Sequence, residues 1–217
     1  MDAVEQASGA RPTSGVEPSI GVGSSAQVGP SKRADARRNY DRLLSAAAAA
    51  FAEHGADDVS LEEIARRAGV GIGTLYRHFP ARQALLEAVY KDQVDGLDAL
   101  GAKLLAAESP GDALAEWMRA FAGFGRTKRS MSSALVATVG KDSALLSACS
   151  MILRNRTDEL LSRAQESGEA RADVQCADIF RLTHGLIMAT EVAPSDPGQL
   201  DRLLSLVVES VVPGARR

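Results

Sequence analysis

The stretch Val59–Phe79, which reads VSLEEIARRAGVGIGTLYRHF, decides the fold that the sequence predicts for the first part of the chain. Ser60 and Glu63 form a capping-box pattern, S-x-x-E, which predicts the start of a helix. Apolar residues then recur at helical spacing as far as Gly69, which suits the left-handed conformation at a helix end. A second short helix is expected over Gly71–His78, ahead of a proline. Two short helices joined by a glycine turn are typical of a helix-turn-helix DNA reader.

The second of these helices is expected to be apolar on one side and small or polar on the other. Ile72, Leu75 and Phe79 repeat at helical spacing and are predicted to face inward, with Tyr76 at the border of the stripe. Two glycines make the helix dependent on packing for its stability. Small outward residues also let a backbone approach a DNA major groove closely. The residues expected to face outward are Gly71, Gly73, Thr74, Arg77 and His78.

A longer helix over Ala36–Glu53 is predicted ahead of this pair. Its leading edge is basic, which suits contact with DNA phosphates. The basic residues of that edge are Lys32, Arg33, Arg37, Arg38 and Arg42. The apolar residues expected to face inward are Tyr40, Leu44, Ala47 and Phe51.

The segment Arg38–Tyr90 resembles the DNA-binding domain of TetR-type transcriptional regulators. The resemblance rests on three motifs together, which are AAAAAFAEHG at 46–55, VSLEEIARRAGV at 59–70 and GTLYRHFPARQALL at 73–86. Two positions depart from the family pattern. Gly71 stands where Ser or Thr is more common, and Arg82 stands where Lys is more common, although its forked guanidinium suits phosphate equally well.

The residues and the resemblance together predict a set of DNA contacts. Thr74 and Arg77 are expected to approach base edges, helped by a close fit at the two glycines, while the other members hold phosphates. For His78 the alternative is a solvated surface residue. The predicted set is Arg37, Arg38, Ser60, Gly71, Gly73, Thr74, Tyr76, Arg77, His78 and Arg82.

We predict an all-α fold for the whole chain, because few runs are rich in β-branched residues. A disordered tail is expected over residues 1–30, which are rich in Gly, Ser, Ala and Pro. A three-helix helix-turn-helix DNA-binding domain is expected over residues 31–80, and a roughly six-helix ligand-binding and dimerisation domain over residues 81–217. The helices predicted for this second domain, the body, are 81–105, 110–124, 131–139, 143–168, 173–192 and 198–212, with a basic break over 125–130.

The body gathers most of the few aromatic and methionine side chains at helical spacing. Such a stripe is commonly core, yet ligand pockets are also apolar with a few polar groups, so both interpretations stay open. His184 is either a satisfied core histidine or a ligand contact. The candidate ligand-binding residues are Trp117, Met118, Phe121, Phe124, Met131, Met151, Asn155, Phe180, His184 and Met188, with Arg154 as a further polar candidate.

The resemblance implies that the last two helices of the body build a homodimer. Gly185, Ala189 and Ser205 are small enough to permit close helix approach, and the apolar residues of 203–208 exceed what one inward stripe needs. The alternative is that these residues form the core of a monomer. A dimer would pair two readers, as a palindromic operator requires.

The distribution of charge along the chain is consistent with DNA binding by its first part. Residues 31–91 hold ten Lys/Arg against eight Asp/Glu, a balance of +2, whereas residues 92–217 hold fourteen against seventeen, a balance of −3. This local positive excess suits a small reader on an acidic body.

No membrane span or secretion signal is recognisable, so a cytoplasmic location is expected. Cys149 and Cys176 are predicted to be buried free thiols.

No cofactor or metal site is predicted. The glycines of 69–73 imitate a nucleotide-binding loop, but no strand precedes them. The three histidines lack metal-ligand spacing, and no nucleophile–base or paired-carboxylate constellation supports an enzyme.

The sequence therefore predicts a ligand-responsive transcriptional regulator, most simply a repressor released from a palindromic operator by a small molecule. The alternatives are a helical adaptor without DNA binding, whose DNA affinity would not respond to changes at Arg77 or Tyr76, and a small-molecule enzyme, which would turn over its bound compound.

Overall fold

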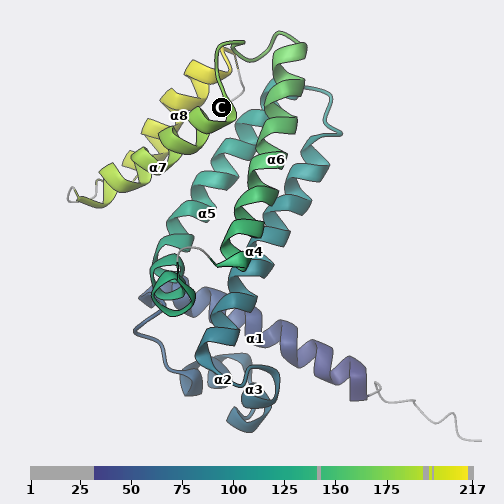
Figure 1. Cartoon of the computed structure of the whole chain (residues 1–217), viewed down its shortest axis with the longest axis vertical. Coiled ribbons are helices and arrows are strands. Elements are labelled where there is room, and N and C mark those ends of the chain that lie inside the picture. Colours follow the sequence, from purple (N-terminus) through teal and green to yellow (C-terminus); the bar gives the residue numbers. More distant parts are fainter. Residues whose placement is uncertain (1–31, 141–142, 193–195, 197, 215–217) are drawn as a thin grey trace, which may run out of the picture.

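Helices fill the described part of the chain (Figure 1). The computed structural model describes residues 32–140, 143–192, 196 and 198–214, with the backbone alone for 126–130, 132, 133, 138, 139, 191 and 192. The all-α fold class is confirmed, and the predicted tail lies outside the described residues. The helices are α1 (Lys32–His54), α2 (Leu61–Ala68), α3 (Ile72–His78), α4 (Arg82–Leu104), α5 (Pro110–Val139), α6 (Ala144–Glu166), α7 (Cys176–Val192) and α8 (Gln199–Val211).

Helix α2 begins and ends as its local sequence predicts. The Ser60 hydroxyl accepts a hydrogen bond from the Glu63 amide at 3.1 Å. At the other end, Gly69 takes the left-handed conformation with φ 64°. The reciprocal half of the capping box is replaced, because the Glu63 carboxylate accepts from Arg66 at 2.7 Å and Arg67 at 2.8 Å.

Helix α5 runs through the expected basic break over residues 125–130, so the two helices predicted there are one. The break was predicted from a glycine and a change of polarity. Gly125 instead marks a close approach, because a Cβ built on it would lie 2.4 Å from Cδ1 of Ile187 on α7. The glycine therefore serves the packing of α5 on α7, and it does not end the helix.

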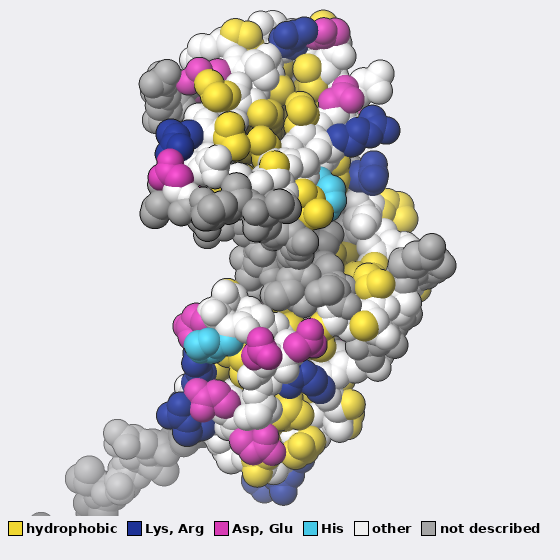
Figure 2. All heavy atoms as spheres, turned by 90° about the vertical axis from the view of Figure 1, so that its left-hand side faces the viewer, with side chains coloured by type: hydrophobic (Ala, Val, Ile, Leu, Met, Phe, Trp, Pro, Cys, Tyr) yellow, Lys and Arg dark blue, Asp and Glu magenta, His cyan; other side chains and the backbone are white. Residues whose placement is uncertain are grey.

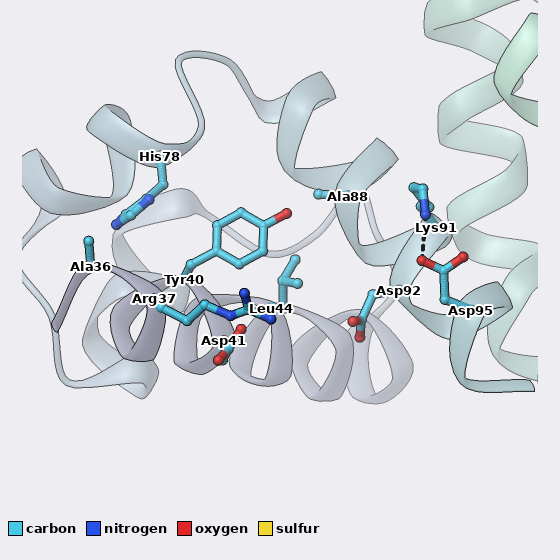
Figure 3. A pocket seen from close by; sticks show the side chains of 10 residues that line it. All are labelled: Ala36, Arg37, Tyr40, Asp41, Leu44, His78, Ala88, Lys91, Asp92 and Asp95. Carbon is cyan, nitrogen blue, oxygen red and sulfur yellow. Dashed lines mark hydrogen bonds and ion pairs between the residues drawn. The ribbon is translucent and has the colours of Figure 1, made fainter. Parts of the chain in front are cut away.

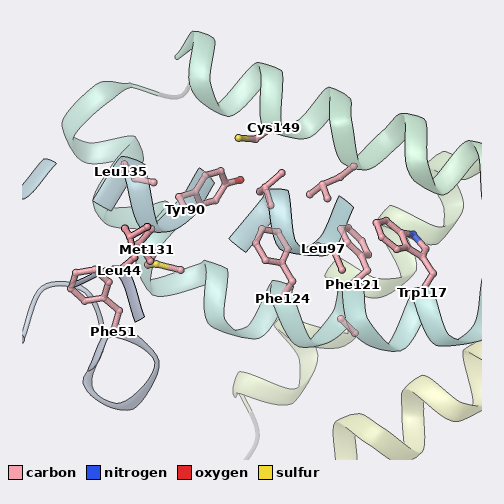
Figure 4. Packing of buried hydrophobic residues seen from close by; sticks show 14 of the residues in the cluster. Leu44, Phe51, Tyr90, Leu97, Trp117, Phe121, Phe124, Met131, Leu135 and Cys149 are labelled. Atoms are coloured by element: carbon pink, nitrogen blue, oxygen red, sulfur yellow. The ribbon is translucent and has the colours of Figure 1, made fainter. Parts of the chain in front are cut away.

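A continuous apolar core joins the first three helices to the rest of the molecule. Leu44 and Phe51 of α1 lie beside Met131 and Leu135 of α5, with Tyr90 of α4 close by (Figure 4). All five side chains are at most 5% exposed. Helix α4 continues this core into the body, where it packs against α5 and α6. The position of the short helices α2 and α3 is thus set by buried contacts that extend into the body.

A buried polar contact fixes α5 against α6 inside the body. The indole N–H of Trp117 donates to the Thr157 hydroxyl at 2.9 Å, and that hydroxyl donates to the Leu153 carbonyl at 2.8 Å. Both side chains are fully buried. Helices α7 and α8 pack against each other and against α5 on one side of this bundle. Of the two cysteines, Cys149 is buried as predicted, whereas Cys176 is only partly buried.

The N-terminus of α5 is capped by a carboxylate from the loop after α6. Glu169 accepts from the Gly111 amide at 2.8 Å and from the Ser109 hydroxyl at 3.0 Å. These hydrogen bonds, led by the one from Gly111, hold the pKa of Glu169 below its ordinary value. The carboxylate form is therefore stabilised by folding.

We expect Glu169→Gln to lower the free energy of unfolding at pH 7, with a difference from the native chain that shrinks in acid. A folded-state pKa below the unfolded-state pKa stabilises the fold above the unfolded pKa, and the contribution is lost as pH falls through the folded pKa. Urea unfolding at pH 7 and at about pH 3.5 measures this difference. The control is Glu166→Gln, an exposed position on α6. A difference that stays constant with pH would contradict the assignment.

Candidate nucleic-acid interface and body cavity

Helix α3 buries one side and leaves the other open. Leu75 is fully buried and Phe79, which follows the helix, is 3% exposed. Ile72 was predicted to share this buried stripe, but it is 37% exposed and lies on the open side with Tyr76 and Arg77. The buried stripe of α3 thus begins at Leu75, and the prediction for Ile72 was wrong. The open face consists of Ile72, Gly73, Tyr76 and Arg77, with Thr74 partly buried at its edge.

The two glycines of α3 are not required by the fold. A Cβ built on Gly71 or Gly73 meets no described atom within 4 Å. Gly71 has φ −70°, a conformation open to any residue, and neither glycine has positive φ. Inside a helix, where Gly73 lies, glycine is destabilising relative to alanine by about 0.5–1 kcal/mol, whereas Gly71 is the N-cap, a position that tolerates glycine. The open space at both glycines would let an outside surface approach the start of α3 closely.

The last turn of α3 rests against α1. His78 lies beside Tyr40 (Figure 3), with ring centroids 5.8 Å apart in an edge-on arrangement. Tyr40 also contacts Phe79. Both His78 and Tyr40 are partly buried. His78 and Arg37 line the same groove between α1, α3 and α4. His78 therefore has a packing role in addition to the predicted phosphate contact.

Helix α2 is held on α1 by a charged network. Arg67 donates to Glu53 of α1 at 2.6 Å and to Glu63 at 2.8 Å. Hydrogen bonds from Arg67 lower the pKa of both carboxyls.

Among the predicted phosphate contacts, Arg38 pairs with Asp35 one turn away, and both side chains are about half exposed. The Ser60 hydroxyl caps α2 from an exposed position.

Arg82 faces inward, although the sequence predicts a phosphate contact for it. Its guanidinium donates to the Val59 carbonyl at 2.5 Å and to the Ala56 carbonyl, and it lies over the Phe51 ring at 5.9 Å from the centroid. Two carbonyl oxygens of the loop between α1 and α2 thus accept hydrogen bonds from this partly buried guanidinium. This arrangement gives Arg82 a positioning role, which no local sequence pattern could reveal because its partners lie 23 and 26 residues away.

We expect Arg82→Met to lower the free energy of unfolding by about 1–3 kcal/mol, because it removes two hydrogen bonds from a charged donor. Thermal unfolding followed by circular dichroism measures the loss. The control is Arg66→Met, whose side chain is 73% exposed and pairs with the carboxylate of Glu63 one turn away, so its effect should stay below about 1 kcal/mol. A stable Arg82→Met variant whose log affinity for DNA loses about one unit of salt slope per subunit would instead assign Arg82 to a phosphate.

The body contains a cavity of about 470 Å³ between α5, α6 and α7. Five of the predicted ligand-binding residues line it, namely Phe121, Phe124, Phe180, His184 and Met188. Residues that the prediction missed complete the lining, namely Gly125, Ser150, Arg181, Thr183 and Ile187, together with the further candidate Arg154. A volume of several hundred Å³ with mostly apolar walls is typical of a small-molecule site.

The other predicted ligand residues lie elsewhere. Trp117, Met118 and Met131 are fully buried in the core outside the cavity lining. Met151 is 59% exposed, and Asn155 is also exposed. Helical spacing placed them with the cavity residues, but they lie on other sides of α5 and α6. His184 is exposed at the cavity, so its interpretation as a core histidine is wrong.

A short helix that is buried on one side and open on the other is how helix-turn-helix proteins present a reader to the major groove. The protein is therefore a DNA-binding regulator of the helix-turn-helix class. No helix in the described ranges is long and apolar enough to cross a membrane. Within the same ranges, no group of three or more His, Cys, Asp and Glu side chains is arranged to hold a metal ion.

Known proteins identify the family. The family model for bacterial regulatory proteins of the tetR family matches residues 43–89. The model for the SbtR-like transcriptional regulator C-terminal domain matches residues 109–211. A TetR transcriptional regulator from Streptomyces coelicolor is 37% identical, with coverage of 81% of this chain and 99% of that chain and a TM-score of 0.69. A TetR regulatory protein from Mycobacterium vanbaalenii is 36% identical, with coverage of 83% and 98% and a TM-score of 0.67.

The chain belongs to the TetR family of transcriptional regulators, whose members bind DNA and are not enzymes. A curated HTH-type transcriptional regulator from Staphylococcus aureus is 38% identical over 63 residues, which cover 29% of this chain and 34% of that protein. The match thus spans about a third of the length of the curated relative.

Proposed function

We propose that this regulator is a ligand-responsive repressor that binds a palindromic operator as a homodimer. The observation that carries the DNA half of the proposal is the open face of α3, where two glycines that the fold does not need border exposed Tyr76 and Arg77. Arg77 is placed to donate to a guanine edge, and Ile72 to contact a thymine methyl group. Arg37 and Arg38, which are exposed near the start of α1, would supply phosphate contacts.

The outer face of α7 and α8 supports the homodimer. Leu182 of α7 is 44% exposed and Leu206 of α8 is 63% exposed. Gly185 and Ala189 share the exposed side of α7 with Leu182, so a second helix can approach closely. Hydrophobic side chains gather on this part of the surface (Figure 2). An apolar patch on a self-complementary face favours a twofold interface, which pairs two readers about 34 Å apart.

We expect Leu206→Asp to convert the dimer to a monomer without unfolding the chain. Each subunit would bury an unpaired carboxylate at the interface at a cost of about 1–3 kcal/mol, so the dimer loses about 2–6 kcal/mol. Sedimentation velocity measures the species present. The control is Val136→Asp, a 40% exposed position on α5 away from this face. A Leu206→Asp chain that sediments as the native one does would place the interface elsewhere.

The cavity supports the ligand half of the proposal. It lies between α5, α6 and α7, and α5 and α6 pack directly on α4, which continues from the reader. A ligand that binds the cavity better in one arrangement of these helices would shift the separation of the two readers. Proteins of the same fold have been crystallised with proflavine and with stearoyl-CoA.

A mobility-shift assay tests the proposed function. The probe is promoter DNA that flanks the protein's own gene, with scrambled DNA of equal length and composition as competitor. We expect sequence-selective retardation at moderate salt, with log affinity falling linearly with log salt. Absence of selective retardation of the promoter DNA would contradict the repressor, and absence of any retardation would favour the helical adaptor. Transcription in vitro from the same promoter then separates repression from activation.

A further inference from the structure

The cavity of the body has a polar group that the protein leaves unsatisfied. Thr183 is 1% exposed, lines the cavity, and its hydroxyl has no hydrogen-bond partner in the described structure. A buried hydroxyl without a partner costs about 1–3 kcal/mol. The hydroxyl itself is inaccessible in this conformation, but its residue belongs to the cavity wall, so a rotation of the side chain toward the cavity would let a ligand oxygen remove that cost.

The charges around the cavity have one sign. Arg154 and Arg181 line it together with His184, whereas its described lining includes no Asp or Glu. Arg181 lies 3.6 Å from Asp178. Arg154 has no carboxylate partner within 4 Å among the described residues, and its guanidinium lies 5.0 Å from the centroid of the Phe180 ring. The cation is therefore held at an aromatic wall and remains available to an anion.

The rest of the lining is mainly apolar. Phe121 and Phe180 contact each other with ring centroids 4.6 Å apart, and Ile187 and Met188 extend this wall along α7. An occupant of this cavity must cover this apolar wall and meet the cation that lies beside Phe180.

We propose that the cavity binds an amphipathic organic anion, whose apolar body lies against Phe121 and Phe180 and whose anionic head meets Arg154. The inference rests on the proposed role of the cavity as the effector site. It adds the chemical class of the effector and the residue that selects it. A neutral compound would leave Arg154 unpaired, and a cationic one would be repelled.

Three probes of one chain length test the class, namely decanoate, 1-decanol and decylammonium, each below its micellar concentration. Titration calorimetry on the full chain measures the affinities, and the emission of the single Trp117, which stacks on Phe121, gives a second readout. We expect decanoate to bind about tenfold more tightly than either other probe. Arg154→Gln should remove this preference, whereas Arg171→Gln, an exposed arginine paired with Asp173, should keep it.

A cavity-filling variant separates the two ways in which the inference can fail. Ser150→Phe places a ring at the cavity wall and should weaken all three probes. Equal affinities for the three probes, or an unchanged preference in Arg154→Gln, would overturn the anion class and leave the cavity as a binding site. Affinities that Ser150→Phe leaves unchanged would overturn the cavity itself, and with it the ligand half of the proposed function.

Discussion

Replacement of Arg77 by alanine is expected to abolish operator binding at physiological salt. Arg77 is exposed on the open face of α3, and we propose that it contacts a base edge. A bidentate arginine–guanine contact contributes about 1–3 kcal/mol of discrimination. A dimer loses the contact twice, so affinity should fall by about 2–6 kcal/mol, or about 30-fold to 10⁴-fold.

Fluorescence anisotropy with labelled operator and with scrambled DNA measures this effect. Arg77→Ala should lower operator affinity far more than affinity for scrambled DNA, because a base contact carries the specificity and a phosphate contact does not. Arg171→Gln, at an exposed site between α6 and α7, is the control for loss of one positive charge. A uniform decrease for both DNAs would assign Arg77 to a phosphate and leave base reading to Thr74 and Ile72.

Replacement of Trp117 by alanine is expected to remove about 3–5 kcal/mol from the free energy of unfolding. The side chain is fully buried, stacks near Phe121 and donates a hydrogen bond to Thr157. Loss of the ring leaves a large cavity between α5 and α6. Loss of the indole N–H removes the donor to the Thr157 hydroxyl, which keeps only its own hydrogen bond to the Leu153 carbonyl among those described. Since folded proteins are stable by only about 5–15 kcal/mol, this change is a large fraction of the total.

Urea unfolding followed by far-ultraviolet circular dichroism measures the loss without relying on tryptophan emission. Trp117→Phe keeps most of the packing, so it should cost clearly less than the alanine variant. Thr157→Val leaves the indole N–H buried without an acceptor and should cost about 1–3 kcal/mol. Met151→Ala, 59% exposed on α6, is the control and should change stability by less than about 0.5 kcal/mol. If the losses in free energy of unfolding from Trp117→Phe and Thr157→Val simply add in the double variant, the hydrogen bond between the two side chains does not stabilise the fold.

The ends of α2 could be predicted because their signals are local. Ser60 and Gly69 fix these ends through groups within a few residues, and the structure places both as caps. The motif run over the reader also predicted the family, since it combines these caps with the apolar spacing of two helices.

Features that depend on distant partners could not be predicted. The inward direction of Arg82 is set by carbonyls of the preceding loop, and the packing role of Gly125 inside α5 depends on Ile187 of α7. Whether Ile72 is buried depends on which element covers the first turn of α3, and helical spacing alone does not reveal that. Helical spacing likewise grouped Met151 with cavity residues, because one apolar stripe does not reveal which of several neighbouring helices it faces.

The buried contacts between α1 and α5 bear on how this regulator can be engineered. Chimeric biosensors are often assembled by joining the reader of one protein to the sensor of another at the boundary between them. A cut at residue 80 would take Leu44 and Phe51 away from Met131 and Leu135. The graft would then need the recipient's α4 and α5 surfaces redesigned together with the junction. New input specificity is therefore more readily obtained by changing the cavity lining within the intact chain than by exchange of whole domains.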